Sequence, residues 1–196
     1  RPVVLVAPTW RGEAFARPEL AADLRRIDRA LGGVDGLEDA LTELWFDAGG
    51  FTHVFCGEPR PDGLAGLHYR GRLLDLQERG LASLASEAEC RADIEPPVYS
   101  IGLRYRLDAD DASWRTTCPK GYASDLGAVD LLIAATRAAL GRRGTAGTDA
   151  MCLLEVSRGE AGYHAVLVLR DGAIRTFYPD PTPRCDKSGR PAACAC

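Results

Sequence analysis

The stretch FTHVFCGEPRPDGLAGLHYRGRLLDLQERG, residues 51–80, organises this chain of 196 residues. It holds two of the three histidines, His53 and His68, and each lies in a short apolar segment. The connector between them, EPRPDGLAG (58–66), contains two prolines and two glycines. Proline fixes φ and glycine permits positive φ, so the connector can reverse the chain. A strand, a tight loop and a second apolar segment would then bring the two imidazoles together.

Two neighbouring histidines are a candidate pair for acid–base chemistry. An unperturbed imidazole has a pKa of about 6.5, so near neutral pH one ring can accept a proton while the other donates one. The spacing alone leaves a second interpretation open, in which the two histidines are unrelated, one capping a segment and one half-buried.

Composition limits the class of protein. With 46% apolar residues the chain can build the core of one domain, with or without a helical annex. No apolar run approaches the ~20 residues of a membrane-spanning helix, so no membrane partner is expected. The net charge of −4 argues against a protein that binds bulk polyanions. Only two residues, Lys120 and Lys187, can supply lysine chemistry.

Seven cysteines are many for this length, and three of them lie in the tail RCDKSGRPAACAC, residues 184–196. Cysteines in such a loop-like tail favour disulfides, which predicts an oxidising compartment and a secreted or extracellular protein. A zinc site through His53 and Cys56 is the alternative, but no second pair of ligands completes it.

Hydrophobic spacing predicts an α+β fold with helices first and paired strands later. The helices are expected over 18–31, 37–48 and 126–140, and the last should be capped by Ser124 or Asp125. Strands are expected over 98–107, 151–156, 163–169 and 173–178, with a hairpin turn at 171–172 and a short strand or arm at 1–8. Residues 73–85 fit either a helix broken at Gly80 or a strand followed by a turn.

Five short motifs resemble those of the EndoU endoribonucleases, the poly(U)-specific, XendoU-like group that includes the coronavirus uridylate-specific enzyme. In order they are LTELWF (41–46), FTHVFCGE (51–58), GLHYR (66–70), LQERG (76–80) and TFYP (176–179). The resemblance implies N-terminal helices packed on the antiparallel β-sheets of an EndoU-like catalytic domain. It implies three parts: a helical subdomain (1–50), a catalytic region (51–180) and a cysteine-rich tail (181–196).

The resemblance also implies a set of site residues. His53 and His68 match the family's catalytic histidines, and Lys120 precedes the long helix, as the family's lysine does. Thr176 and Tyr178 alternate out from the same strand, where the family is associated with uridine preference. The chain departs from the family at Thr52, where a glutamate is usual, so a carboxylate that orients His53 must come from elsewhere. It departs again at Tyr69, where the family has asparagine.

These residue types suit cleavage of RNA by its own 2′-hydroxyl, which leaves a 2′,3′-cyclic phosphate. By analogy with the family, His68 is the base, His53 the acid and Lys120 the stabilising cation. RNA is therefore the expected partner and DNA is not. No cofactor is required, although the resemblance allows Mn²⁺, and an inhibitor protein is left open.

Three alternatives are left open as well. The chain could be an RNA-binding module that has lost the chemistry, or a secreted domain stapled by disulfides. The third is a Cys–His hydrolase built on Cys56, against which a strand at 51–56 would count because it would place Cys56 and His53 on opposite faces. His164 is expected to be an ordinary strand residue.

Overall fold

The computed structural model describes residues 18–61, 63–142, 149–158, 161–181 and 196. The helices are α2 (Pro18–Leu31), α3 (Leu37–Phe46), the single-turn π-helix η2 (Thr52–Cys56), α4 (Arg70–Glu78) and α5 (Ala128–Gly141). The strands are β1 (Glu58–Arg60), β2 (Gly63–Ala65), β3 (Ala82–Leu84), β4 (Asp93–Glu95), β5 (Val98–Tyr105), β6 (Arg115–Ala123), β7 (Ala150–Arg158), β8 (Ala161–Arg170) and β9 (Ala173–Pro179). Helices at the N-terminus and antiparallel strands later confirm the α+β prediction.

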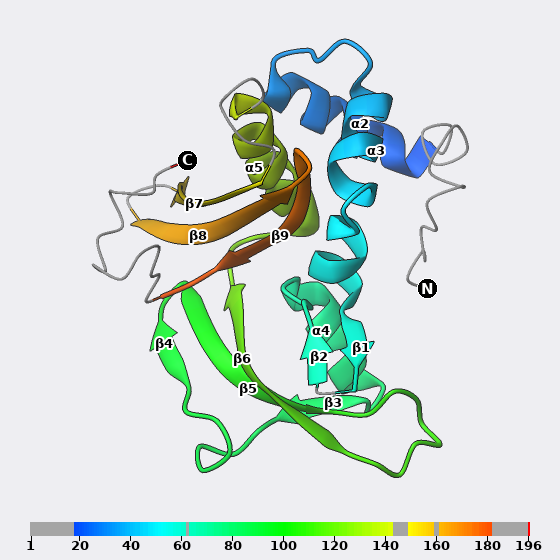
Figure 1. Ribbon diagram of the computed structural model, residues 1–196, viewed down its shortest axis with the longest axis vertical. Helices are drawn as coiled ribbons and strands as arrows, with labels where there is room; N and C mark the ends of the chain where they lie inside the picture. Colours follow the sequence, from blue (N-terminus) through cyan, green and yellow to red (C-terminus); the bar gives the residue numbers. More distant parts are fainter. Residues whose placement is uncertain (1–17, 62, 143–148, 159–160, 182–195) are drawn as a thin grey trace.

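The strands form three antiparallel sheets (Figure 1). β1 and β2 make a small hairpin, and β7, β8 and β9 make a sheet in chain order. In the third sheet β5 is central: β6 pairs along one edge, while β3 and β4 pair with the two ends of the other. The sheets divide the molecule into an upper part with β7–β9 and a lower part with β3–β6 (Figure 1).

The upper part has a core shared by α2, α3, α5 and the β7–β9 sheet. The apolar face of α3 carries Leu41, Leu44 and Trp45 into this core, and each is about 1% exposed. The indole Nε1 of Trp45 donates a hydrogen bond of 2.9 Å to Thr136 Oγ1 on α5, so the buried N–H of this large side chain has a partner. Phe177 of β9 is fully buried in the same core.

The lower part has a separate, smaller core between β2, α4 and the β3–β6 sheet. The two parts meet where β6 passes β9. A Cβ at Gly121 on β6 would lie 2.0 Å from the carbonyl oxygen of Pro179 on β9, so only glycine permits this approach. The junction brings the end of β6 beside the end of β9, and the histidines lie at the same junction.

The structure corrects the predicted backbone at two places. Residues 51–56 form a helical turn, not a strand: His53 N–H donates to Gly49 O, and Gly57 N–H closes the π turn on Thr52 O. β-branched and aromatic residues suggested a strand, but burying Val54 beside Phe55 on one side requires a helical turn. Residues 73–85 match neither alternative in full, because α4 ends at Glu78, before Gly80, and the strand β3 (Ala82–Leu84) follows the turn instead of preceding it.

The second correction concerns the segment of Lys120, for which the sequence predicted no strand, although it lies on strand β6. Strand β6 contains Pro119, which cannot donate a hydrogen bond to a β-ladder. The register of β5 and β6 shifts between Ile101 and Leu103, and this bulge accommodates the proline.

Other predicted elements are confirmed, with small changes at their ends. Helix α3 stops at Phe46 instead of residue 48, and α5 is capped by Gly127 instead of Ser124 or Asp125. The turn Asp171–Gly172 has φ of 50° and 79°, as a tight hairpin requires. None of the described helices combines the length and apolar character that crossing a membrane would need. The arm at 1–8, Lys187 and most of the cysteine tail lie outside the described residues.

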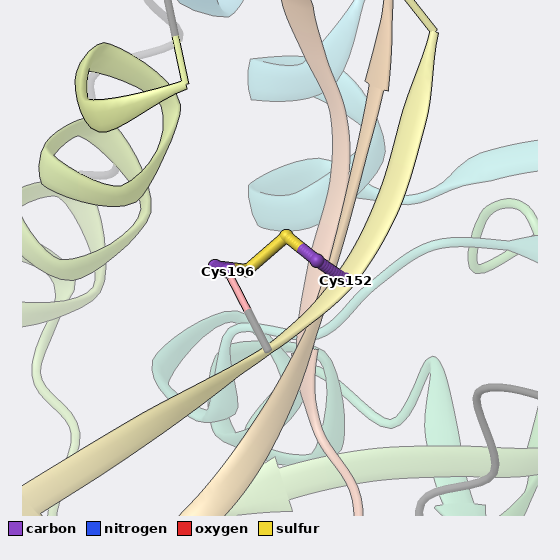
Figure 2. Close-up of a disulfide and its surroundings, with 2 residues drawn as sticks. All are labelled: Cys152 and Cys196. Atoms are coloured by element: carbon purple, nitrogen blue, oxygen red, sulfur yellow. A yellow bond between two sulfur atoms is a disulfide. The ribbon is translucent and has the colours of Figure 1, made fainter. Parts of the chain in front are cut away.

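Cys152 on β7 is bonded to the C-terminal Cys196 (Figure 2). The backbone N–H of Cys196 also donates to Leu153 O at 2.8 Å, so the last residue lies along β7. A tail cysteine thus acts as a staple, as the sequence predicted, while Cys185 and Cys194 lie outside the described residues.

Candidate functional site

The structure brings His53 and His68 together. Their ring centroids are 5.9 Å apart with 47° between the planes. The segment after the connector pairs with turn η2, because Leu67 N–H donates to His53 O and His68 N–H donates to Val54 O, both at 2.8 Å. Gly66 makes this contact possible: its φ is +68°, and a Cβ there would lie 1.9 Å from His53 O. The connector therefore reverses the chain and brings the two histidines together, as its prolines and glycines predicted.

His68 lies between the ring of Tyr178 and the backbone of β6. The two rings stack with centroids 4.8 Å apart and 24° between planes. Nδ1 of His68 is 3.4 Å from Gly121 O, and a carbonyl can only accept, so Nδ1 carries the hydrogen and Nε2 is left as an acceptor. Burial, followed by the charges of Lys120 and His53, lowers the pKa of His68 to about 3. This histidine is therefore neutral at pH 7.

His53 has a different environment. Its Nδ1 is 3.3 Å from Glu58 Oε2, so it donates to the carboxylate. Burial lowers the pKa of His53, and the hydrogen bond to Glu58 opposes that shift. Of the two histidines, His53 has the partner that favours the protonated form.

Glu58 is held in place by two arginines. Arg175 Nη1 and Nη2 donate to its two carboxylate oxygens at 2.9 and 2.7 Å, and Arg60 Nη2 donates at 3.0 Å. The bonds from Arg175 lower the pKa of Glu58 to about 2. The sequence left the carboxylate that orients His53 unidentified. The structure identifies it as Glu58, in the FTHVFCGE motif itself.

If the chain cleaves RNA, as its motifs imply, replacing Glu58 with glutamine should lower kcat for an RNA oligomer about 10-fold, because His53 loses the carboxylate that positions it. Removing that charge also lowers the pKa of His53. If His53 acts as the protonated acid, the falling limb of the pH–rate profile at high pH should move to lower pH. The exposed Glu78, changed to glutamine in the same way, is the matched control. An E58Q profile that coincides with the wild type would contradict this role.

Lys120 approaches the histidines from β6. Its side chain is buried, with 7% of the residue exposed, and Nζ donates to Leu64 O. Burial lowers the pKa of Lys120 to about 8, so the ammonium form still predominates at pH 7. The next residue on β6, Gly121, contacts His68 through its carbonyl oxygen, and the charge of Lys120 contributes to lowering the pKa of both histidines.

A groove of about 390 Å³ opens beside His68. Its lining residues are His68, Arg91, Asp93, Ser100, Pro119, Gly121, Tyr178, Pro179 and Asp180. Phe177 is buried in the core below, and Tyr178 faces the groove on the other side of β9, as the alternation predicted. Thr176 is not part of the lining, and its buried hydroxyl has no hydrogen-bond partner among the described residues.

Two other sequence hypotheses receive no support from the described residues. On a helical turn Cys56 and His53 are no longer on opposite faces, so the strand argument against a Cys–His hydrolase fails. However, burial raises the pKa of Cys56, which keeps the thiol protonated. Among the described residues, no three His, Cys, Asp or Glu side chains come together as a possible metal-binding group. His164 lies on β8 and lines a separate cavity of about 210 Å³.

The geometry thus combines a neutral imidazole that lines the groove, a second imidazole 5.9 Å from it that is bonded to a carboxylate, and a buried ammonium group on the adjoining strand β6. Such a set can remove a proton, return one and stabilise developing negative charge.

Comparisons with known proteins bear on the family and the fold of the chain. Residues 47–181 match the family described as bacterial EndoU nuclease, which is more than half of the chain. The solved structure of XendoU, described as a splicing independent snoRNA processing endoribonuclease, aligns with a TM-score of 0.50 at 16% identity. The alignment covers 84% of this chain and 69% of XendoU, and it shows a shared fold.

A second solved structure is the endoribonuclease Nsp15 of Middle East Respiratory Syndrome Coronavirus. It aligns with a TM-score of 0.44 at 18% identity, over 66% of this chain. The aligned part spans about a third (33%) of the Nsp15 chain. No curated protein matches the sequence.

Proposed function

We propose that this chain, which belongs to the bacterial EndoU nuclease family, is an endoribonuclease that cleaves single-stranded RNA on the 3′ side of uridines. The observation that supports the proposal is the approach of His53 to His68, which lines the groove and contacts Gly121, the neighbour of Lys120 on β6. RNA supplies the nucleophile, so the protein needs only to move protons and stabilise charge.

In the proposed reaction His68 removes the proton of the 2′-hydroxyl. The 2′-oxygen attacks the adjacent phosphorus while the bond from phosphorus to the 5′-oxygen breaks. His53 donates a proton to the departing 5′-oxygen, and the product carries a 2′,3′-cyclic phosphate. Lys120 stabilises the negative charge that develops on the phosphoryl oxygens. No step is assigned to a metal ion.

The protonation states support these roles. His68 is neutral and has Nε2 available as an acceptor, as a base requires. Burial lowers the pKa of His53, but its hydrogen bond to the ionised Glu58 opposes that shift by stabilising the charged form that an acid requires. A phosphate that enters the groove adds negative charge near both rings and raises their pKa values toward the neutral range, where proton transfer is most effective.

Base preference is assigned to Tyr178, whose ring is partly exposed in the groove and offers a surface on which a base can stack. The likeness of TFYP to the family motif supports uridine as that base. Because the hydroxyl of Thr176 is buried, it would contact a base only after a local rearrangement.

The deciding experiment uses RNA oligomers with a single uridine, incubated with the wild-type protein in EDTA. Cleavage should follow the uridine and leave a 2′,3′-cyclic phosphate end, identified by mass spectrometry. An oligomer with 2′-deoxyuridine at that position should stay intact, since it lacks the nucleophile, and one with adenosine there should be cut slowly.

Ends with a free 3′-hydroxyl, or cleavage of the 2′-deoxyuridine oligomer, would overturn the mechanism. Binding without cleavage would instead identify an RNA-binding module that has lost the chemistry. Equal cleavage at every base would support the nuclease activity and contradict the uridine preference.

A further inference from the structure

Two cysteines that take no part in the proposed reaction lie together on the lower sheet. Cys90 follows β3 in the segment 86–93, and Cys118 is on β6. Cys118 is exposed and Cys90 is half-buried, and neither is bonded to another described cysteine. They are 28 positions apart in the chain, so their meeting is a property of the fold.

The segment that carries Cys90 has a fixed backbone. Cys90 N–H donates to Ser86 O at 2.9 Å, and Glu89 N–H donates to the same oxygen at 3.0 Å. The side chains of Ser86 and Glu89 close the turn, because Ser86 Oγ donates to Glu89 Oε2 at 2.8 Å. Cys90 is therefore presented from a defined turn.

Hydrogen bonds fasten this turn to β6 at the position of Cys118. Cys118 Sγ lies 3.6 Å from Glu89 O, and Thr116 Oγ1 donates to Glu89 Oε1 at 3.2 Å. Burial, followed by the neighbouring thiol of Cys118, raises the pKa of Cys90 to about 11.

The backbone of β5 leaves room for this pair. Gly102 lies under Cys90, and a Cβ there would be 2.3 Å from Cys90 Cβ and 2.7 Å from its Sγ. Ile101 pairs with Lys120 and Leu103 with Thr117, so Gly102 lies opposite the bulge that contains Cys118. Gly102, which has no side chain, therefore lies at the same point of the sheet as the extra residue in the bulge of β6.

We propose that Cys90 and Cys118 form a disulfide in addition to Cys152–Cys196. The oxidant is a small disulfide such as oxidised glutathione. The exposed Cys118 thiolate attacks one sulfur of glutathione disulfide and releases one glutathione thiolate. Cys90, after loss of its proton, attacks Cys118 Sγ in the mixed disulfide and releases the second glutathione. Two protein thiols become one disulfide, and one oxidised glutathione becomes two reduced molecules.

The bond would fix one wall of the groove. Arg91 and Asp93 follow Cys90 and line the groove with His68, and Pro119 next to Cys118 lines it as well. A covalent link would hold the segment 86–93 against the strand that presents Lys120. The disulfide can be tested by its chemistry alone, so it does not depend on the proposed nuclease activity.

The test is peptide mapping of the full chain after incubation with oxidised glutathione at pH 8, with free thiols alkylated before digestion. Trypsin should release residues 80–91 (GLASLASEAECR) and 116–120 (TTCPK) as one linked species, lighter by two hydrogens than the sum of the two peptides. Reduction should separate them. Recovery of both peptides in alkylated form, or linkage of either to another cysteine, would overturn the proposal.

A second measurement uses the variant with both cysteines changed to serine. Without reductant its Tm should be lower than that of the wild type by roughly 5–10 °C, because the unfolded chain loses a crosslink. In a reductant the difference should nearly vanish. The exposed Cys56, changed to serine, is the matched control and should leave Tm unchanged. An equal difference with and without reductant would contradict the disulfide.

Discussion

Replacing His68 with glutamine is expected to lower kcat for RNA cleavage by about 10³-fold. Glutamine is polar and similar in reach, but its amide cannot take a proton from the 2′-hydroxyl. The neutral state and free Nε2 of His68 suit it to that step. The rate is measured with the single-uridine oligomer at saturating concentration. The matched control is His164→Gln, since His164 is half-buried on β8 and does not line this groove. Equal rates for H68Q and wild type would show that His68 is not the base of the reaction.

The same variant should change how stability depends on pH. His68 has an ordinary pKa of 6.5 in the unfolded chain and about 3 in the folded protein. Above pH 6.5 it is neutral in both states, so it does not change the free energy of unfolding with pH. Between pH 6.5 and pH 3 the unfolded state binds a proton that the folded state does not. The free energy of unfolding therefore falls with falling pH, by up to about 1.4 kcal/mol per pH unit.

H68Q should lose this part of the pH dependence. Urea unfolding of both proteins between pH 6.5 and 5 measures it, because Glu58, with a pKa of about 2 when folded and 4.5 when unfolded, is present in both and cancels in the comparison. His53 is present in both proteins, so its own contribution largely cancels in the comparison. Parallel stability curves for wild type and H68Q would show that His68 is not held neutral by burial.

The sequence predicted that the two histidines meet, because the two prolines and two glycines of the connector favour a reversal of the chain. It failed on the backbone around His53, since the apolar run at residues 51–56 fits a strand as well as a helical turn. Only the packing of Val54 and Phe55 into the upper core decides between them. Strand β6 could not be predicted from its own residues, because Pro119 lacks the N–H that a β-ladder uses. The bulge that accommodates Pro119 depends on pairing with β5.

The orienting pair of His53 lay beyond sequence reasoning for a different reason. Glu58 is within the quoted motif, but Arg175 is 117 positions away, and its bonds to Glu58 exist only because β9 packs against η2. Alternation correctly placed Thr176 and Tyr178 opposite Phe177. It could not show that only Tyr178 reaches the groove, because that depends on the β6–β9 junction at Gly121.

Replacing Lys120 with methionine should lower kcat by about 10³-fold and at the same time stabilise the protein. The loss of activity follows from losing the cation that stabilises the charged transition state. The gain in stability follows from burial, which lowers the pKa of Lys120 from 10.5 to about 8 and so makes its charge costly in the folded state. Methionine fills similar space without charge, while Leu64 O loses its donor. The net gain in the free energy of unfolding at pH 7 should be about 1–2 kcal/mol.

The pH dependence distinguishes this explanation from a general packing effect. Between pH 8 and about 10.5, folded Lys120 is neutral while the unfolded chain still binds the proton, so the wild type gains stability as pH rises. The stability difference between K120M and wild type should therefore shrink across that range, as measured by urea unfolding at pH 7, 8, 9 and 10. Lys187, the other lysine, changed to methionine, is the control for activity. If K120M cleaves RNA normally, Lys120 is not the catalytic cation, and if the stability difference stays constant with pH, its charge is not what burial penalises.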